Sequence, residues 1–133
     1  MRAAVASLAL LLALPTAPAS AGIKGTFIGP GVYAMPGRCE KLDAIAKGGP
    51  KNIETVPETL TMDGFEGWEG ACTFRSITEI EKGRKWKASM DCHEGAEEGP
   101  ESDIFERMPD GSLKVTVMGN ETIFVRCDKD KGN

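Results

Sequence analysis

The chain has 133 residues, 20 of them acidic and 16 basic, so its formal net charge is −4 at pH 7. This balance argues against nucleic acid and anionic membrane surfaces as partners, and it permits a basic partner. Residues 1–21 read as a secretory signal peptide: Arg2 precedes an apolar run too short to cross a bilayer, and Ala19-Ser20-Ala21 is a typical cleavage site. We therefore expect residues 22–133 to form a single periplasmic or secreted domain, with no membrane anchor after cleavage and a net charge of −5 once Arg2 is removed.

The segment after this leader is rich in glycine and proline up to Gly37. Residues 26–28 and 32–34 are short strand candidates within it. Residues 39–47 (CEKLDAIAK) predict one or two helical turns, because Gly48-Gly49-Pro50 is a strong helix stop.

From Ile53 onward the pattern changes to that of a β protein. Short runs rich in β-branched and aromatic residues alternate with turn signals. These signals are Asp63-Gly64, Lys82-Gly83, Asp110-Gly111 and Gly119-Asn120. The spacing predicts a mostly β fold, an antiparallel meander that closes as a small barrel or packs as a sandwich.

The central hairpin can be assigned a register. Residues 85–92 alternate cleanly between apolar and polar side chains, and a three-residue loop, Glu81-Lys82-Gly83, would use Gly83 in the left-handed conformation. This register pairs Cys72 with Cys92, Phe74 with Met90, and Thr78 with Trp86.

The last hairpin is predicted to have a three-residue loop, Met118-Gly119-Asn120. With this loop, residues 113, 115 and 117 share the core face with residues 123, 125 and 127. In the preceding strand Ile104 and Met108 fit the core face and Phe105 points away. Glu106 falls between them, so we expect a bulge there or an end open to water.

Four cysteines remain after the leader, an even number that indicates disulfides in an exported chain. The hairpin register allows Cys72–Cys92, which leaves Cys39–Cys127 as a link between the N-terminal segment and the last strand. The alternative is the sequential pairing, Cys39–Cys72 with Cys92–Cys127.

The stretch SMDCHEGAEEGPESD, residues 89–103, contains the only histidine and most of a local acidic run. One histidine without a Cys-x-x-Cys motif does not make a zinc site, and calcium-loop spacing is absent, so no metal or other cofactor is expected. We interpret the stretch as the end of a strand followed by a solvated loop that can act as a contact surface. The candidate contact residues are Glu94, Glu97, Glu98, Glu101 and Asp103.

Catalytic residues are not indicated by the sequence. His93 is the only histidine, and Gly-x-Ser-x-Gly and phosphate-binding glycine motifs are absent. A carboxylate-based hydrolase is the weakest alternative. Its best candidate is Glu106, because a carboxylate on an apolar face would have a raised pKa.

Three features together resemble those of a loose group of short, exported proteins of Gram-negative bacteria. They are Glu69-x-x-Cys72, Trp86 leading to Cys92-x-x-Gly95, and the terminal pair Arg126-Cys127. The resemblance spans residues 39–127 and implies no activity. The architecture is also similar to small periplasmic barrels that inhibit lysozymes or proteases, although their Ser-Gly-x-x-Tyr loop is missing.

These observations predict a monomeric, non-enzymatic binding or interaction module. Its acidic stretch would contact a basic protein, and an inhibitor of a basic secreted enzyme is the sharpest form of this hypothesis. The alternative is a carrier of a small apolar ligand inside a barrel lined by Trp86, Met90 and Val115. Bulky inward side chains leave little room for such a ligand.

Overall fold

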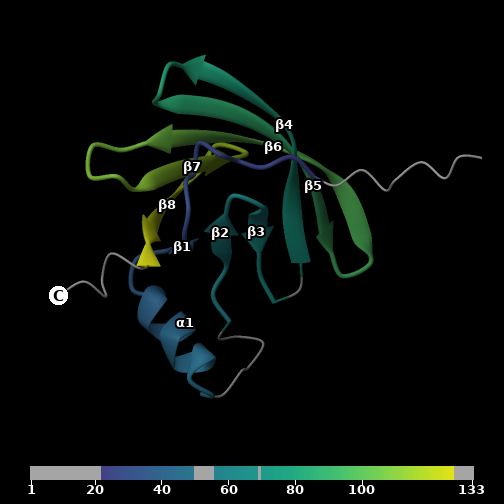
Figure 1. Cartoon of the computed structure of the whole chain (residues 1–133). Coiled ribbons are helices and arrows are strands. Elements are labelled where there is room, and N and C mark those ends of the chain that lie inside the picture. Colours follow the sequence, from purple (N-terminus) through teal and green to yellow (C-terminus); the bar gives the residue numbers. More distant parts are fainter. Residues whose placement is uncertain (1–21, 50–55, 69, 128–133) are drawn as a thin grey trace, which may run out of the picture.

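The computed structural model describes residues 22–49, 56–68 and 70–127. Eight antiparallel strands form a closed barrel in the order β1 to β8 (Figure 1). The predicted signal peptide lies outside the described residues. The elements are β1 (Tyr33–Ala34), α1 (Cys39–Ala46), β2 (Thr59–Thr61), β3 (Gly64–Glu66), β4 (Gly70–Glu81), β5 (Lys85–Glu94), β6 (Glu97–Arg107), β7 (Leu113–Val117) and β8 (Asn120–Arg126).

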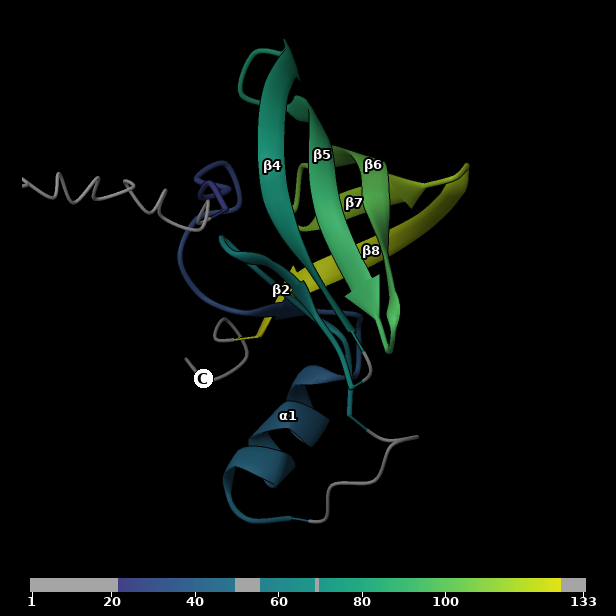
Figure 2. The ribbon, with the colours of Figure 1, turned by 90° about the vertical axis from the view of Figure 1, so that its right-hand side faces the viewer.

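The barrel closes through β1, which pairs with β2 on one side and with β8 on the other. The mostly β prediction is therefore confirmed, in its barrel form rather than as a sandwich. The predicted helical turns are also confirmed, and α1 lies outside the barrel (Figures 1 and 2). Among the described helices, none is both long and apolar enough to pass through a bilayer.

Both disulfides of the first predicted pairing are present. Cys72 and Cys92 face each other across β4 and β5, with Cα atoms 4.0 Å apart. Cys39, the first residue of α1, is bonded to Cys127, directly after β8. The backbone N–H of Cys127 also donates to the Val32 carbonyl, 2.8 Å away, so hydrogen bond and disulfide together fasten the β1–β8 seam.

The β4–β5 register agrees with the prediction at one end only. Cys72 opposes Cys92 and Phe74 opposes Met90, but a bulge at Arg75 then shifts the pairing by one residue. Thr78 therefore faces Lys87, not Trp86 as predicted, and Glu79 faces Trp86. A second irregularity follows between Glu79 and Glu81, and the connecting turn is Lys82-Gly83-Arg84. Alternation alone does not reveal a bulge, because one extra residue reverses all later side chains.

The predicted last hairpin was wrong by one residue. Val117 pairs with Asn120, so the turn has two residues, Met118 and Gly119, both with positive φ. That conformation suits the twist of a two-residue hairpin. Thr122 and Phe124 therefore share the inner face with Leu113 and Val115, whereas residues 123 and 125 lie on the outer face.

The inner face of β6 also differs from the prediction. Phe105 is fully buried and opposes Trp86 and Val115, while Ile104 and Glu106 point outward. Phe105 packs against Phe27, Phe65 and Phe74, with ring centroids 5.2–5.9 Å apart. These aromatic rings fill the centre of the barrel. The wider core comprises Ile28, Tyr33, Leu60, Phe65, Phe74, Ala88, Met90, Phe105, Leu113, Val115 and Phe124.

Residues 25–28 close one end of the barrel. They form a turn rather than the predicted strand, and Phe27 stacks on Trp86 with centroids 4.7 Å apart. The Arg107 guanidinium holds this turn by donating to the carbonyl oxygens of Phe27 and Ile28, at 2.7 and 3.1 Å. The opposite end of the barrel is therefore the accessible one.

Candidate functional site

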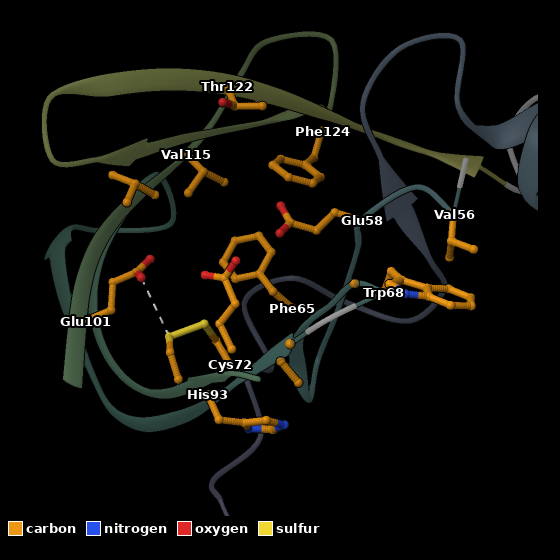
Figure 3. A pocket seen from close by; sticks show the side chains of 16 residues that line it. Val56, Glu58, Phe65, Trp68, Cys72, His93, Glu101, Val115, Thr122 and Phe124 are labelled. Carbon is orange, nitrogen blue, oxygen red and sulfur yellow. Dashed lines mark hydrogen bonds between the residues drawn. A yellow bond between two sulfur atoms is a disulfide. The ribbon is translucent and has the colours of Figure 1, made fainter. Parts of the chain in front are cut away.

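A cavity of about 690 Å³ opens at the end of the barrel where β4 begins and β5 ends (Figure 3). We call it the mouth cavity. Its inner wall comes from strands distant in sequence, because β3, β4, β7 and β8 each turn alternate side chains inward. Its size lies in the range of pockets that hold small organic ligands.

Apolar side chains make most of this wall. Phe65 and Phe124 lie at its base, packed against each other with ring centroids 5.5 Å apart. Val115 and the Cys72–Cys92 disulfide line the sides, and Trp68, 48% exposed, stands at the rim. Figure 3 shows the aromatic rings of Phe65 and Phe124 on the cavity side of their strands. The walls can therefore bury an apolar ligand body.

Carboxylates gather at the same place. Glu58, Glu94 and Glu101 all line the cavity, together with His93. Glu101 lies across from Met90 on the inner face of β6, and its Oε2 atom is 3.7 Å from Cys92 Sγ. No lysine or arginine is found among the described lining residues. The mouth cavity is consequently an apolar pocket with a negative charge.

Asp103 lies one inward position deeper than Glu101 on β6. It opposes Ala88 of β5 and Val117 of β7, and its exposed fraction is 0%. Within the described part of the chain, no group donates a hydrogen bond to either carboxylate oxygen of Asp103. An ionised carboxylate buried in this way destabilises the folded protein, because the free energy lost when a charge is desolvated is recovered only when the charge is paired.

This environment changes the acidity of Asp103. The pKa of Asp103 is raised from its ordinary value of 3.8 to about 8, first by burial, then by a hydrogen bond that the protonated carboxyl shares with Glu101, and then by the negative charges of Glu101 and Glu58. The pKa of Glu58, at the exposed rim, is also raised, first by partial burial and then by Glu101. Near neutral pH Asp103 therefore holds a proton in the folded protein.

A metal centre does not fit these residues. Over the described ranges, the only group of three side chains close enough to share an ion is Cys72, Cys92 and Glu101. Both sulfurs of that group are in a disulfide and are not thiolate ligands. Glu58, Glu101 and Asp103 thus interact electrostatically without forming a compact set of ligands.

The acidic stretch predicted to be a solvated loop is a β-hairpin. β5 continues to Glu94, β6 starts at Glu97, and Gly95-Ala96 forms the turn. Gly99 and Pro100, residue types that usually interrupt strands, lie within β6, opposite Cys92 and Asp91. Strand pairing thus overrides the local preference of these two residues.

The five candidate contact residues do not form one surface. Glu97 and Glu98 are exposed, and Glu94 is exposed at the edge of the mouth cavity. Glu101 is half-buried inside that cavity, and Asp103 is inaccessible from outside. The strand alternation of β6 separates them.

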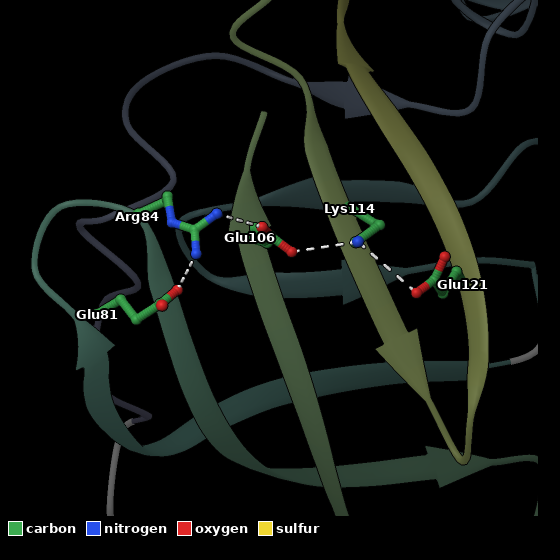
Figure 4. Close-up of polar contacts among 5 residues, drawn as sticks. All are labelled: Glu81, Arg84, Glu106, Lys114 and Glu121. Carbon is green, nitrogen blue, oxygen red and sulfur yellow. Dashed lines mark hydrogen bonds and ion pairs between the residues drawn. The ribbon is translucent and has the colours of Figure 1, made fainter. Parts of the chain in front are cut away.

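Glu106 occupies the outer wall instead of an apolar face. Lys114 Nζ lies 3.2 Å from Glu106 Oε2, and Arg84 Nη1 lies 2.9 Å from Glu106 Oε1. Arg84 also pairs with Glu81, and Lys114 also pairs with Glu121 (Figure 4). The hydrogen bond from Lys114 is the largest cause of a lowered pKa of Glu106. The expectation of a raised pKa at Glu106 was therefore wrong, and Asp103 has that property.

We expect Glu106→Gln to change the thermal unfolding midpoint by less than ~2 °C. Although the Glu106 side chain is only 14% exposed, its partners Arg84 and Lys114 are 55% and 25% exposed and remain hydrated without it. Such ion pairs contribute little, and the substitution leaves the shape of the side chain intact. Thermal unfolding at low and high salt measures this. A midpoint that falls by 8 °C or more would contradict the view that Glu106 belongs to a surface network.

The sequence interpretation identified some cavity residues and missed others. Val115 lines the mouth cavity as expected of a carrier, but Trp86 and Met90 pack in the filled half of the barrel. Glu58 was not singled out. Glu101 and Asp103 were predicted to be contact residues on the surface, because only the hairpin pairing reveals that they point inward. The chain gave no match to any family model, curated protein or solved structure with which we compared it.

Proposed function

We propose that the protein is an exported, non-enzymatic binding module that takes a small, partly apolar ligand into the mouth cavity. One observation carries the proposal: half of the barrel is filled with aromatic rings, while the other half contains an accessible cavity with apolar walls. Such concave, preformed, mostly apolar sites with a few polar groups are typical of ligand-binding proteins. Export agrees with the two disulfides.

The walls of the mouth cavity are held in place by the barrel core and by a disulfide. Phe65, Phe124 and Val115 are at most 8% exposed and belong to the core that also holds the barrel together. The Cys72–Cys92 disulfide fixes β4 to β5 at the rim. A pocket on rigid strands requires little ordering when a ligand binds, which favours affinity.

A protein-contact role is the second candidate. Glu94, Glu97 and Glu98 remain exposed around the β5–β6 turn, where they could face a basic partner such as a secreted enzyme. Glu101 and Asp103 add nothing to that surface, so the acidic patch is smaller than the sequence suggested. A contact made there does not depend on free volume inside the barrel.

Filling the mouth cavity should separate the two candidates. Thr122 lines the cavity on β8, opposite Val115, and Thr122→Trp would place an indole in the space proposed for the ligand. We expect it to weaken binding of a neutral apolar fluorescent probe, N-phenyl-1-naphthylamine, at least 10-fold. Fluorescence titration of the folded variant measures this.

The matched control is Thr78→Trp, which makes the same exchange at an exposed position of β4 and should leave probe binding unchanged. Near-ultraviolet circular dichroism verifies that both variants fold. If the wild-type protein binds no probe, or if Thr122→Trp binds as well as Thr78→Trp, ligand binding in the mouth cavity is refuted and the protein-contact role takes its place.

A further inference from the structure

We infer that the mouth cavity selects ligands with an organic cation, such as a primary amine, attached to an apolar body, and that Asp103 and Glu101 receive the cationic group. This inference rests on the proposed function and specifies the ligand class. It follows from three features of the site: its apolar walls, its negative charge, and a buried carboxyl group to which no described residue donates a hydrogen bond.

The charge of the cavity excludes the most common apolar ligands. Glu58, Glu94 and Glu101 line it, and no lysine or arginine among the described lining residues offsets them. A fatty acid or another anion would place a negative charge beside these carboxylates and would be repelled. A cation is attracted by the same groups, which also gives selectivity against neutral compounds.

The depth of Asp103 indicates where the cationic group goes. Asp103 is not itself a lining residue of the cavity, but it follows Glu101 inward on β6 and pairs with Val117, and both of these neighbours line the cavity. No group in the described chain donates a hydrogen bond to either oxygen of Asp103, although the residue is fully buried. An ammonium group has three N–H donors and no acceptor, so it satisfies carboxylate oxygens that the protein itself leaves unsatisfied.

The apolar part of the ligand then faces Phe65, Phe124 and Val115. Aromatic rings attract cations in addition to apolar groups. A bare divalent ion fits less well, because no three described carboxylates converge within coordination distance of one another and a small ion would leave the walls uncovered. An amine of naphthyl size uses both parts of the site.

Binding should also release a proton. The titratable groups that line the cavity are Glu58, His93, Glu94 and Glu101, and the lining residues from β7 and β8 are uncharged. Burial, together with the neighbouring carboxylates of Glu101 and Glu58, keeps the pKa of Asp103 at about 8 in the free protein. An alkylammonium ion, itself charged up to about pH 10, would stabilise the ionised carboxylate, so about one proton leaves per ligand bound at pH 6.5.

The experiment compares three probes of the same apolar body: 1-naphthylmethylamine, 1-naphthylmethanol and 1-naphthoic acid. Calorimetric titration at pH 6.5, in two buffers with different ionisation enthalpies, gives both affinity and proton release. We expect the amine to bind at least ~10-fold more tightly than the alcohol, and the acid more weakly than either. Asp103→Asn should lower the affinity for the amine to that for the alcohol and abolish proton release.

Controls keep the result unambiguous. Glu98→Gln removes an exposed carboxylate from the same strand and should change nothing. If Asp103→Asn does not fold, Glu101→Gln is used, with an expected ~5-fold loss for the amine. Equal binding of amine and alcohol to the wild-type protein overturns the cation selectivity and leaves the proposed function standing. Failure of all three probes overturns both. Calcium chloride that binds in an Asp103-dependent manner, with no preference for the amine, overturns the organic-cation assignment.

Discussion

Asp103→Asn should stabilise the protein, and the gain should grow with pH. At pH 8.5 we expect the thermal unfolding midpoint to rise by at least ~5 °C, whereas at pH 4 the change should be under ~2 °C. An asparagine side chain has nearly the shape of the protonated aspartic acid but never carries a charge, so it removes the cost of ionising a buried group. Few substitutions of a native polar residue are expected to stabilise.

The direction of this pH dependence follows from which state of the chain, folded or unfolded, binds the proton. Below about pH 4 the Asp103 carboxyl is protonated in both the folded and the unfolded chain. Between the ordinary pKa of 3.8 and the folded pKa of about 8, the unfolded chain releases the proton and the folded protein keeps it. The wild-type free energy of unfolding therefore falls with rising pH across this window, by up to about 1.4 kcal/mol per pH unit. Above pH 8 Asp103 is ionised in both the folded and the unfolded chain, and the free energy of unfolding stays lowered by the full cost of burying the charge.

The measurement is thermal unfolding of both proteins from pH 4 to pH 9, with Glu98→Gln as the control for loss of one negative charge. Glu98 is exposed, so its curve should run parallel to that of the wild-type protein. If Asp103→Asn destabilises at pH 8.5, or shifts stability equally at all pH values, Asp103 is not the buried protonated acid described above.

Removing the Cys39–Cys127 disulfide should destabilise the protein more than removing Cys72–Cys92. The first closes a chain segment with a sequence separation of 88 and the second one with a separation of 20. Loop-closure entropy alone gives about 4–5 kcal/mol for the longer segment and about 3 kcal/mol for the shorter. The first bridge also fastens the two-residue β1–β8 seam, whereas β4 and β5 remain joined by their long ladder.

Denaturant unfolding of the two double variants, Cys39→Ala with Cys127→Ala and Cys72→Ala with Cys92→Ala, compares these costs. Because each variant loses two thiols and keeps one bridge, each serves as the control of the other. The reverse order of stability would show that the barrel rim, rather than the seam, limits stability. A smaller denaturant dependence in the first variant would indicate an open barrel in the native state.

Local signals determined the parts of the fold that could be predicted. The Cys72–Cys92 pairing was predicted from side-chain alternation and a three-residue turn, and the helix was predicted from its glycine stop. The observed turn lies one residue later than predicted, and the two irregularities of β4 offset that difference, so the cysteines still pair. The errors came from single-residue shifts. The bulge at Arg75 and the two-residue turn at Met118-Gly119 each reverse every later side chain, and neither has a distinct signature in one sequence.

The candidate site was harder to predict because its residues meet only when the barrel closes. Asp103 appears in the sequence as one acid among several, and its burial depends on pairing with both Ala88 and Val117. Glu58 precedes a short strand far from β6 in the chain, and it reaches the same cavity through the β2–β3–β4 pairing. Composition cannot distinguish an inward carboxylate from an outward one.

The bulges of β4 have a consequence for self-association. β3 pairs with β4 only along Ala71–Thr73, so the rest of that long strand, up to Glu81, presents an edge that no other described strand covers. Exposed backbone edges recruit strands from other molecules and begin aggregation. Here two irregularities interrupt the edge, and Arg75, Glu79 and Glu81 place charges along it. The residues that displaced the predicted register are therefore also expected to disfavour edge-to-edge pairing between copies of the chain.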